Sequence, residues 1–160
     1  MHKSRQFALA ILVRAAASAA MLVSAAAMAA GPGHGTKDEA VAMTKKAVAH
    51  FKAEGKDKAL ADFSRKGSAF VDRDLYVFAL DMNGKNIAHA TNERMIGRDL
   101  MQLKDADGKS YVIEIIEKAK IGKPAWIDYK WPNPLTKEIE AKSSYCEPVD
   151  GGVICVGAYK

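Results

Sequence analysis

The sequence predicts a single α+β domain built on an antiparallel sheet of about five strands. Three observations support this prediction: helical periodicity over residues 36–63, short apolar runs separated by turn residues from residue 75 onward, and one amphipathic segment between two groups of these runs. Helices and strands that alternate in such blocks are typical of α+β folds. The length of 160 residues suits one domain with a real core.

The first thirty residues resemble an export signal. A positively charged start precedes an uncharged, alanine-rich run, and Ala27 and Ala29 then stand at the A-x-A spacing that a signal peptidase recognises. The run is too short and too poor in large apolar residues to favour a transmembrane anchor. We therefore expect residues 1–30 to be a signal peptide and residues 31–160 to form one periplasmic or secreted domain without a membrane span.

The charge balance argues against a nucleic-acid partner. The full chain carries a formal net charge of +5, and three of its basic residues (Lys3, Arg5 and Arg14) belong to the predicted leader, so the mature chain carries +2. The remaining Lys and Arg residues are interspersed with Asp and Glu, as on an ordinary solvated surface.

The first predicted element is a helix that begins after Thr36. Thr36 and Glu39 fit a capping box, and Gly55 is expected to end or kink the helix. Its apolar stripe consists of Ala40, Met43, Ala47, Val48 and Phe51. A second short helix follows, with Ala59, Leu60 and Phe63 as its apolar side.

The strands come next. An apolar run at 75–80 and a second run at 86–89 flank Asn83-Gly84, which is a strong hairpin signal. Residues 91–108 are loop-like, and 110–121 form an amphipathic helix that Gly122 stops. Three further strands are predicted at about 125–131, 138–147 and 152–159.

Cys146 and Cys155 are the only cysteines of the chain. A two-residue turn at Asp150-Gly151 pairs residue 146 with 155 as a non-hydrogen-bonded pair, the closer kind. A disulfide is therefore feasible in an exported protein, and two reduced, buried thiols are the alternative.

The sequence contains no signature of a nucleotide-binding, serine-hydrolase or zinc-protease site. Two fragments that resemble calcium loops lack the further ligands and are better explained as turns. We expect no catalytic residues, no metal site and no cofactor.

Several residues could line a small-molecule site. His89 ends a strand, where it could face a cleft or simply bond to the backbone. Alternation places Tyr129 and Trp131 on one face of their strand and Trp126 on the other. Aromatic residues of a strand are often core, but they can also wall a pocket.

Lys142 interrupts an otherwise ordinary strand. It could be a solvated lysine or a fixed cation for an anionic ligand. Alternation sends Lys142 and Tyr145 to opposite faces, so both can serve one site only if a bulge or twist re-aims one of them.

The succession of "DLYVFALDMNGKNIAHATNERMIGRDL", "LKDADGKSYV", "WIDYKWPNP" and "KSSYCEPVDGGVICVGAY" resembles the single Cache domain family, the PAS-like extracytoplasmic sensor modules of bacterial chemoreceptors and histidine kinases. The resemblance covers roughly residues 38–159. It implies a long N-terminal helix packed on an antiparallel PAS-like sheet, with a pocket on the other side of the sheet for a small molecule, often a short-chain carboxylate.

Carried over by position, the pocket residues implied by the resemblance are His89, Tyr129, Trp131, Lys142 and Tyr145, with Arg94 and Trp126 in reserve. Lys142 would neutralise the carboxylate. The chain ends at Lys160 without a second apolar span, so we expect it to act as a free periplasmic binding protein or through a separate partner such as a membrane receptor or kinase. The alternative is a redox- or haem-associated exported protein, suggested by His89 and the two cysteines.

Overall fold

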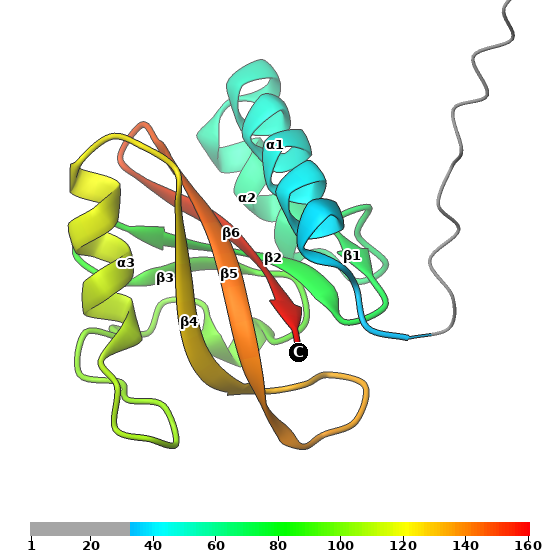
Figure 1. Ribbon diagram of the computed structural model, residues 1–160. Coiled ribbons are helices and arrows are strands. Elements are labelled where there is room, and N and C mark those ends of the chain that lie inside the picture. The colour runs from blue at the N-terminus through cyan, green and yellow to red at the C-terminus, as the bar shows by residue number, and fades with distance from the viewer. Residues whose placement is uncertain (1–32) are drawn as a thin grey trace, which may run out of the picture.

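An antiparallel sheet separates two groups of helices (Figure 1). The computed structural model describes residues 33–160, so the predicted signal peptide lies outside the described residues. The helices are α1 (Lys37–Glu54), α2 (Lys56–Ser64), the 3-10 turn η1 (Glu93–Met95) and α3 (Tyr111–Lys120). The strands are β1 (Val71–Asp72), β2 (Leu75–Asp81), β3 (Asn86–His89), β4 (Ala125–Pro132), β5 (Ile139–Val149) and β6 (Gly152–Tyr159).

The sheet has the order β1-β2-β6-β5-β4, and β3 pairs with β2 on the edge that β1 also uses. The predicted α+β class is confirmed, and the sheet has six strands where about five were expected. The additional strand, β1, is only two residues long and pairs with the start of β2 around Arg73, whose φ is 55°. A pair this short leaves no alternation in the sequence from which it could be predicted.

The N-terminal helix begins where the capping box predicted. The Thr36 side chain accepts a hydrogen bond from the Glu39 amide, and the Glu39 carboxylate accepts one from the Thr36 amide. Gly55 separates α1 from α2 with a φ of 81°, a left-handed conformation that favours glycine.

The β5–β6 hairpin has the predicted register. Val149 pairs with Gly152, and Cys146 pairs with Cys155. The two cysteines form a disulfide, as the hairpin geometry allowed. Because both are buried, the bond lies inside the core rather than at the surface.

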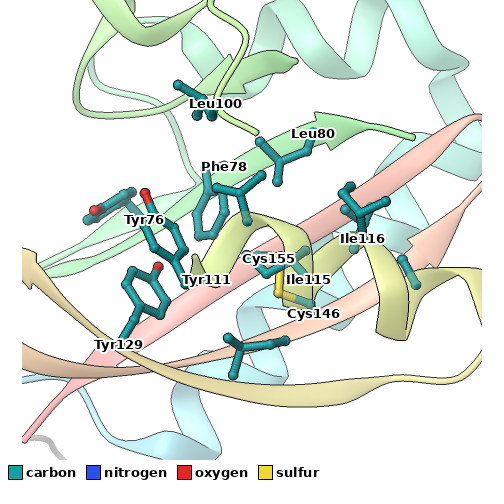
Figure 2. Close-up of a cluster of buried hydrophobic side chains, with 14 of the residues drawn as sticks. Tyr76, Phe78, Leu80, Leu100, Tyr111, Ile115, Ile116, Tyr129, Cys146 and Cys155 are labelled. Atoms are coloured by element: carbon teal, nitrogen blue, oxygen red, sulfur yellow. A yellow bond between two sulfur atoms is a disulfide. The ribbon is translucent and has the colours of Figure 1, made fainter. Parts of the chain in front are cut away.

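Each face of the sheet has its own core. On one face, α1 and α2 cover a cluster that includes Phe51, Phe63 and Ile154. On the other face, α3 covers a cluster that includes Ile115, Ile116 and the disulfide (Figure 2). Within residues 33–160, no helix is both long and apolar enough to cross a membrane.

Candidate functional site

A narrow cavity opens on the sheet face that carries α3. Its volume is about 20 Å³, which is room for about one water molecule. The residues that line it come from β2, β3, the loop after β3, α3 and β4: Tyr76, Phe78, Leu80, Asn86, His89, Met95, Leu100, Tyr111, Val112, Tyr129 and Trp131. The wall is thus mostly aromatic and aliphatic, with very few polar groups.

A wider hollow of about 260 Å³ lies on the surface beside this cavity. The two spaces share Tyr76, His89 and Trp131, so these side chains form the partition between the cavity and the surface. A molecule larger than water can pass from the hollow into the cavity only if these side chains move.

Lys142 is the most unusual residue near the cavity. It is 1% exposed, and within residues 33–160 its Nζ atom has no hydrogen-bond partner. The amine lies 3.8 Å from the centre of the Tyr76 ring and 4.7 Å from the centre of the Tyr159 ring. Burial lowers the pKa of Lys142 well below its usual range, and the charge of Asp74 opposes this shift only in part.

Gly157 makes the space that Lys142 occupies. A Cβ atom at Gly157 would lie 2.1 Å from Cε of Lys142 and 2.4 Å from Oγ of Ser144. The aliphatic part of the lysine therefore rests directly on the glycine of β6. Any side chain at this position would compete with the lysine for the same volume.

Three tyrosines lie near Lys142. The rings of Tyr76 and Tyr159 lie against the amine, and Tyr129 is the cross-strand neighbour of Lys142 in β4. Burial raises the pKa of all three phenols, so they are neutral donors rather than counter-ions for the lysine. Tyr76 and Tyr159 bring their hydroxyl oxygens within 3.4 Å of each other.

The other tyrosine contacts fix the rings in place. The Tyr129 hydroxyl lies 2.9 Å from Oγ of Ser144, and the Tyr159 hydroxyl donates to the carbonyl of Pro132. The Tyr129 ring stacks on Tyr111 of α3 with centroids 4.2 Å apart. In Figure 2 the rings of Tyr76, Tyr111 and Tyr129 gather at one end of the buried cluster.

His89 lies in the cavity wall and also bonds to the backbone, so it combines the two roles that the sequence left open. Its Nδ1 accepts a hydrogen bond of 3.1 Å from the Asn92 amide, and its ring stacks on Tyr76. Burial, together with the nearby Lys142, lowers the pKa of His89 to about 3. The imidazole is therefore neutral at physiological pH and adds no charge to the cavity.

Asp74 is the acidic residue whose charge reaches Lys142, but its hydrogen bonds go elsewhere. Its carboxylate is fully buried and accepts from the Gly35 amide, the His34 ring and the Asn133 amide. These contacts join the segment before α1 to the β4–β5 connection. Asp74 is thus already satisfied without Lys142.

The structure brings His89, Tyr129, Trp131 and Lys142 to one face of the sheet, as the sequence predicted for Tyr129 and Trp131. Arg94 is exposed in η1 and lines a separate surface hollow beside His89. It does not line the cavity.

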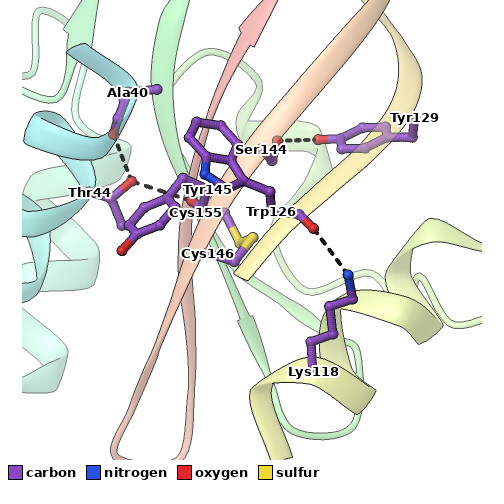
Figure 3. The surroundings of a disulfide bond; sticks show 9 residues. All are labelled: Ala40, Thr44, Lys118, Trp126, Tyr129, Ser144, Tyr145, Cys146 and Cys155. Carbon is purple, nitrogen blue, oxygen red and sulfur yellow. Dashed lines mark hydrogen bonds between the residues drawn. A yellow bond between two sulfur atoms is a disulfide. The ribbon is translucent and has the colours of Figure 1, made fainter. Parts of the chain in front are cut away.

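Trp126 and Tyr145 lie on the opposite face, under α1. They are cross-strand partners with ring centroids 5.2 Å apart, and Thr44 of α1 donates to the Tyr145 carbonyl. Figure 3 shows both rings close to Thr44, while Tyr129 extends in another direction. β4 and β5 pair in unbroken register, so no bulge re-aims Tyr145 toward Lys142.

Tyr76 and Tyr159 were missed from the sequence, although a signal existed for Tyr159. The hairpin register that pairs 146 with 155 also places residue 142 opposite 159. Tyr159 therefore has the place beside Lys142 that was expected of Tyr145. Tyr76 has no comparable signal, because it lies in an apolar run that is buried on both faces.

The structure adds no observation in favour of the redox- or haem-associated alternative. Both cysteines are joined in a buried disulfide, and His89 is buried and bonded through Nδ1. Across residues 33–160, no three or more His, Cys, Asp or Glu side chains are arranged to hold a metal ion.

Comparison with known families gives a match over most of the described chain. The model of the Cache domain family matches residues 43–160.

Two curated relatives are similar in sequence. The methyl-accepting chemotaxis protein McpP of Pseudomonas putida is 31% identical over 90 residues, which is 55% of this chain and 16% of that protein. The sensor histidine kinase MctS of Rhizobium johnstonii is 35% identical over 78 residues, 49% of this chain and 17% of that protein. The chain thus matches about a sixth of the length of these relatives.

Solved structures share the fold at lower identity. A methyl-accepting chemotaxis protein from Vibrio parahaemolyticus aligns over 77% of this chain and 87% of that chain, with a TM-score of 0.66 and 24% identity. A Cache chemosensory domain described for its carboxylic acid recognition aligns over 76% of this chain and 86% of that chain, with a TM-score of 0.59 and 22% identity.

Proposed function

The chain belongs to the Cache domain family, and from that membership we propose that it is a periplasmic, non-catalytic sensing domain for a short-chain carboxylate. Buried Lys142 carries the proposal. An amine that is removed from water without an anionic partner is costly, and a carboxylate in the cavity would supply that partner. The lysine is thus held in place for a ligand that compensates its charge.

The tyrosines supply the remaining polar contacts. Neutral phenols can donate to a carboxylate, and Tyr76 and Tyr159 have their hydroxyl groups next to each other close to the lysine. A carboxylate that enters between them would accept hydrogen bonds and pair with Lys142 at the same time. The mostly apolar wall suits a short alkyl chain attached to this head group.

The narrow cavity implies that binding moves side chains. Because the space of about 20 Å³ is smaller than any carboxylate, the partition of Tyr76, His89 and Trp131 must shift when a ligand enters from the surface hollow. A sensing domain needs a difference between its free and bound states, and this partition is where that difference begins.

Two further parts of the proposal rest on the relatives. The names of the curated relatives are those of a chemoreceptor and a sensor kinase, which supports a signalling partner for this domain. The carboxylic acid recognition described for one structural neighbour supports the class of ligand. We infer that the ligand-bound domain acts on a membrane receptor or kinase.

Isothermal titration calorimetry with acetate, propionate and butyrate tests the proposal. We expect saturable binding of at least one of these acids by the native protein and no measurable binding by Lys142→Met. Lys130→Met is the matched control, because Lys130 lies on the neighbouring strand with its amine at the surface beside Asp107. Equal affinities of the Lys142→Met variant and the native protein would contradict the proposal.

A further inference from the structure

The side chain of Asn86 is the second buried polar group without a partner. Asn86 is 1% exposed and lines the cavity, and within residues 33–160 its Oδ1 atom has no hydrogen-bond partner. A buried amide oxygen that lacks a donor costs free energy, as the buried amine of Lys142 does. Carboxylate binding at Lys142 does not explain this cost.

A β-bulge turns Asn86 toward the cavity. The register between β2 and β3 pairs Ala79 with Ala88 but Leu80 with Asn86, so Ile87 is the extra residue. Regular alternation would place Asn86 on the same face as Ala88, in the cluster under α1 and α2. Instead, Ile87 and Ala88 both pack in that cluster, and Asn86 faces the cavity beside Leu80. Bulges that re-aim a side chain are frequent at functional sites.

The backbone of Asn86 is fixed from both sides. Its strand pairs with β2, and its other edge bonds to the loop after η1: the Asn86 amide donates to the Arg98 carbonyl, and its carbonyl accepts from the Gly97 amide. The side chain is therefore held in a defined position, as expected for a group that recognises a ligand.

Asn86 lines the cavity, whereas Lys142 lies behind the cavity wall, against the ring of Tyr76. The lysine amine contacts the Tyr76 ring, whereas Asn86 is opposite Leu80. Tyr76 and Leu80 are four residues apart on β2, so their Cα atoms are separated by about 13 Å along an extended strand. A ligand whose carboxylate pairs with Lys142 would reach Asn86 only with the far end of its chain.

The chemistry of the wall selects the group at that far end. An ammonium group would need a counter-ion, and no Asp or Glu lines the cavity. A second carboxylate could not donate to Oδ1 and would bring a charge that neutral His89 does not balance. A hydroxyl group can donate to the amide oxygen and accept from the amide nitrogen, so it satisfies Asn86 in either orientation of the amide.

We propose that Asn86 is a specificity-determining residue, which selects a short monocarboxylate with a hydroxyl group at the end opposite the carboxylate. This proposal rests on the proposed function, since it places the carboxylate of the ligand at Lys142. In this proposal, the bulge at Ile87 turns the side-chain amide of Asn86 toward the hydroxyl group of the ligand.

Four acids of equal chain length, which differ only at the far end, test the proposal by calorimetry: butyrate, 4-hydroxybutyrate, 4-aminobutyrate and succinate. We expect the native protein to bind 4-hydroxybutyrate about 5- to 150-fold more tightly than butyrate, the range that corresponds to satisfying one buried acceptor. We expect 4-aminobutyrate and succinate to bind more weakly than 4-hydroxybutyrate.

The variant Asn86→Leu should reverse the preference, so that butyrate binds more tightly than 4-hydroxybutyrate. Asn83→Ser is the matched control, because Asn83 is exposed in the same hairpin, and it should keep the native preference. If Asn86→Leu does not fold, the order in which the native protein prefers the four acids still tests the role of Asn86.

The possible failures are distinct. Equal binding of butyrate and 4-hydroxybutyrate by the native protein, or binding of acetate with no binding of any of the four acids, would overturn the role of Asn86 and leave the proposed function intact. A native protein that binds none of these acids, acetate included, would overturn both.

Discussion

At the scale of single residues, we propose that Lys142 lowers the stability of the free domain in favour of ligand binding. Its amine is buried without a hydrogen-bond partner within the described part of the chain, and the aromatic rings around it compensate only a fraction of the lost hydration. The residue that would hold the ligand is therefore a burden on the free domain. A lysine with a purely structural role would be expected to stabilise the free domain, whereas a lysine kept for a ligand can destabilise it.

The variant Lys142→Met should be more stable than the native protein. Methionine fills a similar volume without a polar group, so we expect the free energy of unfolding to rise by about 1–3 kcal/mol. Urea denaturation of the ligand-free proteins measures the change. A variant less stable than the native protein would show that the buried amine makes favourable contacts, and it would remove the reason for assigning it a ligand.

Particular residues show how far the sequence can predict the site. Tyr129 and Trp131 could be assigned to one face of their strand, since alternation holds through the unbroken β4–β5 ladder, whereas the sequence left open whether Lys142 joins them. Asn86 could not be assigned, because the bulge at Ile87 breaks alternation and nothing in the letters "NGKNIAH" marks it. Local rules place a side chain only where the ladder is regular.

At the scale of elements, β6 is shaped to accept a side chain from β5. Gly157 faces Ser144 across the ladder and leaves room for the stem of Lys142, so a methyl group there would overlap both side chains. The absence of a side chain at Gly157 thus determines the position of Lys142.

We expect Gly157→Ala to lower the free energy of unfolding by about 1–3 kcal/mol, as overpacking in a core commonly does, and to weaken carboxylate binding. A double-mutant cycle with Lys142→Ala identifies the cause. If the lysine stem is the group displaced, Gly157→Ala should cost clearly less stability in the Lys142→Ala background. An equal cost in both backgrounds would place the clash elsewhere.

The disulfide stabilises the β5–β6 hairpin beneath α3. Its two cysteines are nine residues apart, and closing a loop of this size contributes roughly 2–3 kcal/mol through the unfolded chain. We expect the Cys146→Ala/Cys155→Ala variant to lose about that much stability and to keep its carboxylate affinity within a few-fold, since neither cysteine lines the cavity. Loss of binding by a variant that remains folded would contradict a purely structural role.

The hairpins and helices were the predictable elements. The capping box at Thr36, the turn at Asn83-Gly84 and the Cys146–Cys155 pairing all follow from local chemistry, and the structure confirms them. The two-residue strand β1 was missed because it exists only through its pairing with β2. A strand of two residues is too short to show an alternation of apolar and polar residues.

At the scale of the whole molecule, the two cores have different tasks. The helices α1 and α2 cover one face of the sheet, and the residues between them form an apolar cluster. The other face carries the cavity, the aromatic partition to the surface and the two buried polar groups that lack a hydrogen-bond partner within residues 33–160. The fold thus confines its unfavourable contacts to the face where we place the ligand.

Ligand binding should therefore couple to protonation of the domain. In the free protein burial lowers the pKa of Lys142, and a bound carboxylate would raise it again. The lysine takes up a proton on binding wherever the pH lies between these two pKa values. Carboxylate affinity should accordingly rise as the pH falls through that window.

The proton uptake itself is the most direct test of the central claim that Lys142 receives a carboxylate. Calorimetric titration in buffers of different ionisation enthalpy, at about pH 9, counts the protons taken up with the ligand, and an ordinary lysine is already charged at that pH. We predict net proton uptake on binding by the native protein and none in any residual binding by Lys142→Met. Binding by the native protein without proton uptake would contradict the account.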